Sequence, residues 1–184
     1  MTWRVTFNGG ESINSLDGVR SNGHIDVGNN IRSNKPIEIR STFGHIVRLA
    51  KGSEFSLIET PVGVRAEYYG ETAVVSMAGP DGKYRTSCYM VAFSEQNPSV
   101  LIRPGKEEQT DEFLVFIGDI SITEYDEDNR QFHICSVCEG EKVVLTYDES
   151  KKMRDRYKVS EVKQLTEEDW QYYLENYLNG SKWR

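Results

Sequence analysis

The sequence is poor in the features that mark small secreted proteins and membrane proteins. Its 184 residues include 3 cysteines, which cannot form a disulfide framework without leaving one thiol unpaired. No stretch approaches the roughly 18 to 20 consecutive apolar residues that a bilayer crossing requires, and the N-terminal residues lack the hydrophobic region of a signal peptide. We therefore expect no membrane span and a cytoplasmic location for the chain as written, or an extracytoplasmic one if it was trimmed from an exported protein.

Positive charge is also in short supply. The chain carries 22 basic and 29 acidic side chains, a net charge of −7, whereas proteins dedicated to DNA concentrate basic residues on one face. Residues 1–104 hold 11 basic and 10 acidic side chains, while residues 105–184 hold 11 and 19. We therefore do not expect nucleic acid as a partner, and we expect partner-facing electrostatics after residue 105.

The motifs of common catalytic sites are missing as well. The sequence has no Gly-x-Ser-x-Gly nucleophile motif, no His-Glu-x-x-His helix, no Gly-x-x-x-x-Gly-Lys-Ser/Thr phosphate loop and no paired His-x-His ligands. Of 3 histidines, His24 and His45 each precede an isoleucine at an expected strand start, without a recognisable catalytic partner. We expect a protein that is not an enzyme and that carries no cofactor.

What the chain does contain is a succession of strand-like segments up to about residue 147. Short runs of β-branched and aromatic residues alternate with Gly, Asn, Asp and Pro at a spacing of 8 to 12 residues, which is typical of β-sandwiches, barrels and solenoids. The pattern predicts a mainly β protein, solenoid- or sandwich-like, with additional antiparallel strands and a C-terminal amphipathic helix. The clearest runs are residues 37–42, 45–49, 54–58, 64–69, 72–77, 84–94, 99–103, 112–123, 131–137 and 142–147.

A polar stretch at residues 105–112 lies between apolar runs and is the predicted boundary between two parts. Residues 1–104 form the first β-rich part. Residues 105–184 form the second, with antiparallel strands and the helix, and we expect it to pack on the first. Because the stretch is short, a rigid junction is expected there.

The predicted helix begins at Thr166, which has the sequence signature of an N-cap with Asp169 as its capping-box partner. Asn179 and Gly180 provide its expected end. The stripe of apolar residues at helical spacing either packs on the protein's own sheet or docks onto a partner protein. For the second role the candidate partner-binding residues are Trp170, Tyr173 and Tyr177. The full stripe is Trp170, Tyr173, Leu174, Tyr177 and Leu178.

Several segments in the first part resemble the FecR-type domain. The likeness runs through Val27–Ser33, Ile37–Arg40, Val47–Leu57 and Glu59–Gly63, and Val100–Gly105 is similar to the closing strand and turn of that family. It covers about residues 26–105.

The pattern departs from the family at three places: Lys51-Gly-Ser53 replaces an acidic-Gly-Ser turn, Gly70-Glu-Thr72 loosens a Gly-Thr-x-Phe block, and residues 79–94 are longer than the family pattern. The resemblance implies a small β domain, often solenoid-like, that serves outside the cytoplasm as a sensor, regulator or adhesion module without catalytic residues of its own.

One segment has the residue types of a metal site. Cys135 and Cys138 stand at the Cys-x-x-Cys spacing that suits thiolate ligation of zinc, with His133 nearby and Cys88 as a distant fourth ligand. No second Cys-x-x-Cys or His-x-x-x-His pair completes the set. We therefore interpret these as ordinary strand residues near a turn at Glu139-Gly140, and we predict no metal site.

Two charged segments have alternative interpretations. Asp126–Asn129 carries oxygen ligands but lacks the Gly and Glu positions of an EF-hand, so we interpret it as a solvated hairpin tip. A basic run could contact phosphates with Tyr147 and Tyr157 available for stacking, but acidic residues interrupt it, which favours a solvated, ion-paired segment. The basic residues are Lys151, Lys152, Arg154, Arg156 and Lys158, and the interrupting ones are Asp148, Glu149, Asp155 and Glu161.

Three functional hypotheses follow. The first is a non-enzymatic module for protein interaction or regulation, resembling FecR-type domains, with a protein partner or self-association. The second is a structural subunit of a repetitive assembly such as a phage virion, tail or filament. The third is a β-barrel that binds a small ligand or acts as an enzyme, for which only a convergence of His133 with acidic residues would argue.

Overall fold

The computed structural model describes most of the chain, with gaps concentrated in the first hundred residues. The described residues are 3–6, 23–32, 37–42, 46–49, 51–52, 54–60, 63–69, 73–76, 83–86, 90–93, 99–107, 109–128 and 130–175.

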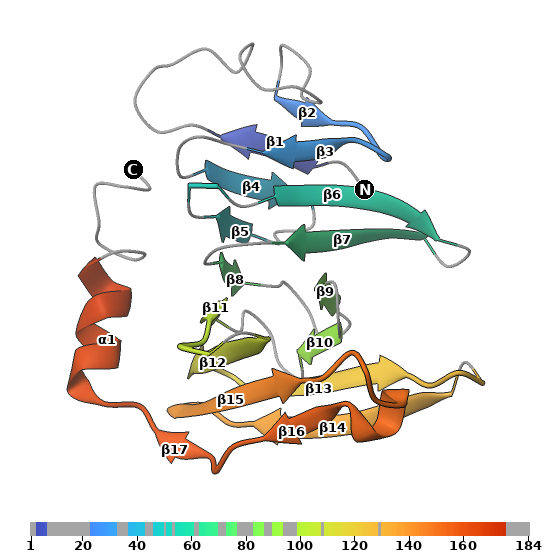
Figure 1. The fold of residues 1–184 in the computed structure, drawn as a ribbon. Coiled ribbons are helices and arrows are strands. Elements are labelled where there is room, and N and C mark those ends of the chain that lie inside the picture. Colours follow the sequence, from blue (N-terminus) through green and yellow to red (C-terminus); the bar gives the residue numbers. More distant parts are fainter. Residues whose placement is uncertain are drawn as a thin grey trace.

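Strands dominate the described residues, and one α-helix follows them near the C-terminal end (Figure 1). The strands are β1 (Trp3–Thr6), β2 (His24–Ile25), β3 (Asn30–Arg32), β4 (Ile37–Ser41), β5 (Ile46–Leu49), β6 (Glu54–Thr60), β7 (Gly63–Tyr69), β8 (Ala73–Ser76), β9 (Lys83–Thr86), β10 (Met90–Phe93), β11 (Ser99–Pro104), β12 (Thr110–Ile117), β13 (Ile120–Tyr125), β14 (Gln131–Val137), β15 (Glu141–Tyr147), β16 (Tyr157–Val159) and β17 (Lys163–Gln164). The helices are the 3-10 turn η2 (Met153–Asp155) and α1 (Glu167–Tyr173).

The strands form two sheets. Sheet A runs in the order β16-β15-β12-β11-β8-β5-β4-β1-β2, with β17 also paired to β15, and sheet B runs in the order β14-β13-β10-β9-β7-β6-β3. The described pairs are antiparallel except for β7 and β9, which are parallel. The prediction of a mainly β protein with antiparallel strands and one C-terminal helix is confirmed.

The main hydrophobic core takes side chains from both sheets. Sheet A contributes residues such as Ile39, Val47 and Phe113, and sheet B contributes residues such as Phe55 and Ile122, all 0% exposed. Because side chains alternate along a strand, the residues between these buried ones face away from the core. The outer face of sheet A is thereby available for other contacts.

Sheet A continues through the predicted boundary at residues 105–112. The amide of Gly105 donates to the carbonyl of Thr110 at 2.7 Å, which closes a tight turn between β11 and β12. A side chain at position 105 would collide with Thr110, since an added Cβ would lie 2.1 Å from its Oγ1. This stretch is thus a hairpin turn between neighbouring strands of one sheet, and the division into two parts stays a prediction.

Two predicted runs were wrong, because each spans two strands. Residues 112–123 include most of β12 in sheet A and the start of β13 in sheet B. Residues 84–94 read as a single long segment in the sequence, whereas the structure has two short strands there, β9 and β10, which pair with each other. Residues 87–89, between these two strands, lie outside the described residues. Within the described part of the chain, no helix has both the length and the apolar character needed to cross a membrane.

Candidate functional site

The outer face of sheet A carries an apolar surface on β11 and β12, which we call the helix footing: Leu101, Leu114 and Phe116. Helix α1 covers it. The ring of Tyr173 stacks on Phe116 with centroids 4.0 Å apart, and the ring of Trp170 meets Phe116 edge-on at 5.0 Å. Tyr173 is 3% exposed, and its hydroxyl shares a hydrogen bond of 2.6 Å with Ser99 Oγ. Aromatic contacts of this kind add to the free energy gained by burying apolar area.

Polar contacts fix the start of α1. Thr166 is the N-cap: its Oγ1 accepts from the Asp169 amide at 3.2 Å, and the Asp169 carboxylate accepts from the Thr166 amide at 2.9 Å, which confirms the predicted capping box. Lys142 Nζ on β15 donates to the same carboxylate at 2.5 Å. Burial acts to raise the pKa of Asp169, but the hydrogen bonds from Lys142 and Thr166 outweigh it and hold the pKa below its ordinary value.

The candidate partner-binding residues therefore fall into two groups. Trp170 and Tyr173 pack on the protein's own sheet, which is the packing role considered for the helix. Tyr177 and the predicted helix end at Asn179 and Gly180 lie outside the described residues. Partner binding by these aromatic residues stays a prediction.

A second feature of the outer face lies further along sheet A, on β4 and β5. Glu38 is 7% exposed and accepts from two arginines: Arg40 Nε donates to its Oε1 at 2.5 Å, and Arg48 Nε donates to its Oε2 at 2.8 Å. Glu38 and Arg48 are direct cross-strand partners, and Arg40 follows Glu38 by two residues on the same face. We call these three residues the Glu38 cluster.

The electrostatics of the Glu38 cluster are unbalanced. Burial acts to raise the pKa of Glu38, but the hydrogen bonds and charges of Arg40 and Arg48 outweigh it and hold the pKa below its ordinary value. The carboxylate is therefore ionised at neutral pH. Two guanidinium groups face one carboxylate, which leaves one positive charge in surplus.

Sequence reasoning missed this cluster, although a signal was present. Ile37 and Ile39 alternate with Glu38 and Arg40, a period of two that places the charged pair on one face of a strand. What the sequence did not reveal was the register with β5, which brings Arg48 opposite Glu38.

The Cys-x-x-Cys segment does not assemble as a metal site. Cys135 packs against the main core, and its burial raises the pKa of its thiol to about 11. Cys138 is exposed, and the nearby Asp119 carboxylate raises the pKa of that thiol too. Metal binding needs the thiolate, so both shifts oppose it. Among the described residues no group of three or more His, Cys, Asp or Glu side chains could hold a metal ion, and Cys88 lies outside them.

His133 has a polar role on the outer face of sheet B. Its Nδ1 shares a hydrogen bond of 3.1 Å with Ser121 Oγ, and its Nε2 lies 3.4 Å from Ser136 Oγ. Both contacts are with hydroxyl groups of β13 and β14. Each ring nitrogen thus has a hydroxyl partner. These two contacts do not bring His133 together with acidic residues, as the hypothesis of a catalytic barrel requires.

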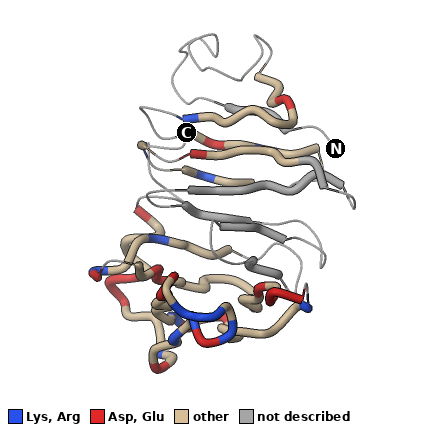
Figure 2. Tube along the Cα trace, turned by 45° about the vertical axis from the view of Figure 1, so that its right-hand side comes forward, with Lys and Arg blue, Asp and Glu red and all other residues tan. Residues whose placement is uncertain are grey.

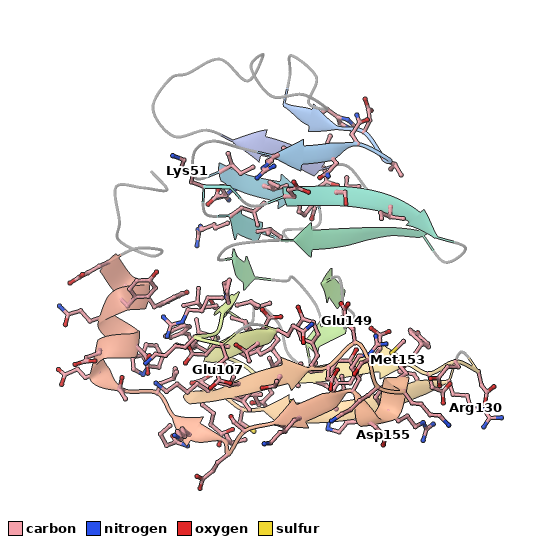
Figure 3. All side chains as sticks on the ribbon, in the orientation of Figure 1. Lys51, Glu107, Arg130, Glu149, Met153 and Asp155 are labelled. Atoms are coloured by element: carbon pink, nitrogen blue, oxygen red, sulfur yellow. The ribbon has the colours of Figure 1, made fainter. Side chains whose placement is uncertain are left out.

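One ion pair and one backbone hydrogen bond join the basic run after β15 to the hairpin tip after β13; Figure 2 colours the charged residues of both segments. Arg154 donates through Nη2 to Asp126 Oδ2 at 2.8 Å, and the Met153 amide donates to Glu127 Oε1 at 3.1 Å. Lys151 lies 3.7 Å from Asp148 within its own loop. Figure 3 shows Met153 and Asp155 in η2, on the same side of the molecule as Arg130 of the tip. Arg154 and Lys151 thus have carboxylate partners, and for the other residues of the basic run the ion-paired interpretation stays a prediction.

Asp126 differs from the solvated tip that the sequence predicted. Its side chain is 7% exposed and its Oδ1 accepts from the amides of Asp128 at 3.1 Å and Arg130 at 2.8 Å. The hydrogen bond from the Arg130 amide and that from Arg154 lower the pKa of Asp126. The carboxylate stabilises the tip, because it accepts hydrogen bonds from backbone amides of the turn and also binds Arg154 of η2.

A shallow pocket of about 260 Å³ opens beside the turn between β11 and β12. Its lining includes Lys106, Glu107, Glu112 and Thr146. Ligand pockets usually span about 300 to 1,000 Å³ and bury most of the ligand, so this volume falls below that range.

Comparison with known proteins shows a likeness of fold. Two crystal structures of a proposed anti-sigma factor from Parabacteroides distasonis superpose on this chain with TM-scores of 0.52 and 0.53 at 12% sequence identity. The superposition covers 80% of this chain and 64% and 65% of theirs, so the chain spans about two thirds of the length of those proteins. No family model matches the sequence. No curated protein matches it either.

Proposed function

We propose that this protein is a non-enzymatic regulatory module that acts through contacts with another protein, related to FecR-type domains. The observation that carries the proposal is the fold shared with the proposed anti-sigma factor over 80% of the chain. The FecR-like segments at about residues 26–105 support it independently, because they were identified from the sequence. At 12% identity the likeness speaks for the fold, so the regulatory role is a proposal.

The architecture suits recognition by a surface. Two sheets share one core, which holds the outer face of sheet A in a fixed shape. Part of this face is covered by α1, and part carries the charged groups of the Glu38 cluster. A rigid face with preset side chains loses little conformational entropy when a partner binds.

The proposal is tested by isolating complexes from cells that contain the protein naturally. The full chain, tagged and crosslinked in place, should recover one protein in stoichiometric amount, and the purified pair should saturate at a fixed ratio in calorimetry. Mass photometry of the purified chain serves as the control. Uniform large particles of the chain alone, with no stoichiometric second protein, would contradict the proposal in favour of a structural subunit.

A further inference from the structure

The Glu38 cluster presents two guanidinium groups whose outer nitrogens have no acceptor among the described residues. Each arginine uses Nε to reach Glu38, one on each carboxylate oxygen. The hydrogen bonds and ion pairs recorded for Arg40 and Arg48 all go to that carboxylate within the described part of the chain. Each guanidinium also has two Nη groups, so the cluster presents further hydrogen-bond donors on the outer face of sheet A.

The exposed fractions show that the cluster is more than a surface ion pair. The Glu38 side chain is 8% exposed and the Arg48 side chain 18%, whereas the Arg40 side chain is 53% exposed. One arginine is therefore held close to the sheet and the other reaches solvent. A single arginine would balance Glu38, so the second adds a positive charge that has no further carboxylate partner among the described residues.

This arrangement prepares the arginines for an anion. The guanidinium group matches a carboxylate with two parallel hydrogen bonds, and holding it through Nε removes much of the side-chain entropy that binding would otherwise cost. Glu38 thus acts as the positioning residue and the two arginines as the binding residues. Lys51 is exposed in the turn that follows β5, and it adds a further positive charge near the C-terminal end of that strand (Figure 3).

We propose that Arg40 and Arg48 form a binding site for a side-chain carboxylate in an acidic segment of the protein partner. The site lies on the outer face of sheet A, on β4 and β5, separated from the helix footing by β8. This inference rests on the proposed function, because it assigns the chemistry of the partner. Charge complementarity selects the occupant: the local surplus is positive, and an acidic segment supplies the carboxylates that the free donors fit.

The test uses the full chain and a capped tetraglutamate peptide as probe, with a capped tetraglutamine peptide and inorganic phosphate as the other arms. Binding is followed by ¹H–¹⁵N spectra that include the arginine Nε–H signals. We expect tetraglutamate to shift the Arg40 and Arg48 signals at low salt and tetraglutamine to leave them unmoved. Phosphate also pairs with a guanidinium through two hydrogen bonds, but tetraglutamate carries several carboxylates that can reach both arginines at once, so phosphate should bind more weakly than the peptide.

Variants separate the site from general charge attraction. In Arg40→Gln, Arg48 still holds Glu38, and the dissociation constant for tetraglutamate should rise about tenfold, equivalent to about 1.4 kcal/mol. Arg32→Gln is the matched control: Arg32 has a 71% exposed side chain on sheet B and lies 3.6 Å from Glu54. We expect it to bind like the unmodified chain.

Three results would overturn the inference: no shift of the Arg40 and Arg48 signals, equal binding by phosphate and peptide, or equal losses in Arg40→Gln and Arg32→Gln. The natural partner then distinguishes the two proposals. A stoichiometric partner that binds Arg40→Gln as tightly as the unmodified chain would leave the proposed function standing and overturn the acidic-segment site alone.

Discussion

The outer face of sheet A carries two regions that differ in polarity and in exposure to solvent. The helix footing is apolar, and α1 seals it with Tyr173 at 3% exposure. The Glu38 cluster on the same face is charged, and its Arg40 side chain stays 53% exposed. Among the described side chains of this face, the chain's own helix covers the apolar surface on β11 and β12, whereas the Glu38 cluster on β4 and β5 stays partly exposed. Partner recognition is then expected to depend more on charge than on apolar contact.

The largest expected effect comes from breaking the apolar region. Phe116→Ala removes the ring on which both Tyr173 and Trp170 rest, and large-to-small changes of this kind lower the free energy of unfolding by about 3 to 5 kcal/mol. Urea denaturation followed by circular dichroism measures it. Tyr172→Ala is the matched control, because that aromatic residue of α1 is 39% exposed and its loss should cost far less. Similar losses in both variants would show that α1 is not seated through Phe116.

Variants of the Glu38 cluster should lower the free energy of unfolding less than Phe116→Ala does, and the loss of the half-buried Arg48 should have the largest effect among them. Arg48→Gln leaves Glu38 with Arg40 alone, and a hydrogen bond to a charged group contributes about 1.5 to 3 kcal/mol to the free energy of unfolding. We expect a loss within that range in the same urea experiment. The double variant Glu38→Gln with Arg48→Gln should recover part of it, since no buried carboxylate then depends on the solvent-exposed Arg40 alone. A double variant less stable than either single one would contradict this account.

How much of this comparison could be predicted from the sequence differs between its two regions. The capping box at Thr166 and Asp169 was predictable, because local hydrogen bonds depend on residues three positions apart. The sequence did not decide which surface α1 covers, because its apolar stripe could pack on the protein's own sheet or on a partner protein. The Glu38 cluster was missed because its partner Arg48 is set by strand register, which depends on which strands pair. The same limit hid the buried state of Asp126, whose partner Arg154 lies 28 residues away.

Acid should weaken both regions through their carboxylates. The folded pKa values of Glu38 and Asp169 lie below the ordinary values of 4.5 and 3.8, so each group adds stability above its ordinary pKa and loses it as the pH falls through the folded pKa. Thermal unfolding between pH 7 and pH 3 should therefore show a falling midpoint below about pH 4.5. In Glu38→Gln combined with Asp169→Asn the fall should be shallower. A fall of unchanged steepness in that variant would assign the acid sensitivity to other carboxylates.

The smallest effect on stability is expected from Arg40→Gln. The difference between Arg40 and Arg48 within the cluster is therefore the strictest test of which residue serves stability and which serves binding. With its side chain 53% exposed, Arg40 forms an ion pair in solvent, and such pairs contribute about 0 to 1 kcal/mol. Arg48 keeps Glu38 satisfied when Arg40 is lost. If the cluster served stability alone, a second arginine would have little reason to be held by the same carboxylate. A loss as large as that of Arg48→Gln would make Arg40 a structural residue. A loss under about 0.5 kcal/mol, together with weaker binding of the acidic peptide, would show that Arg48 stabilises the cluster and that Arg40 contributes mainly to binding.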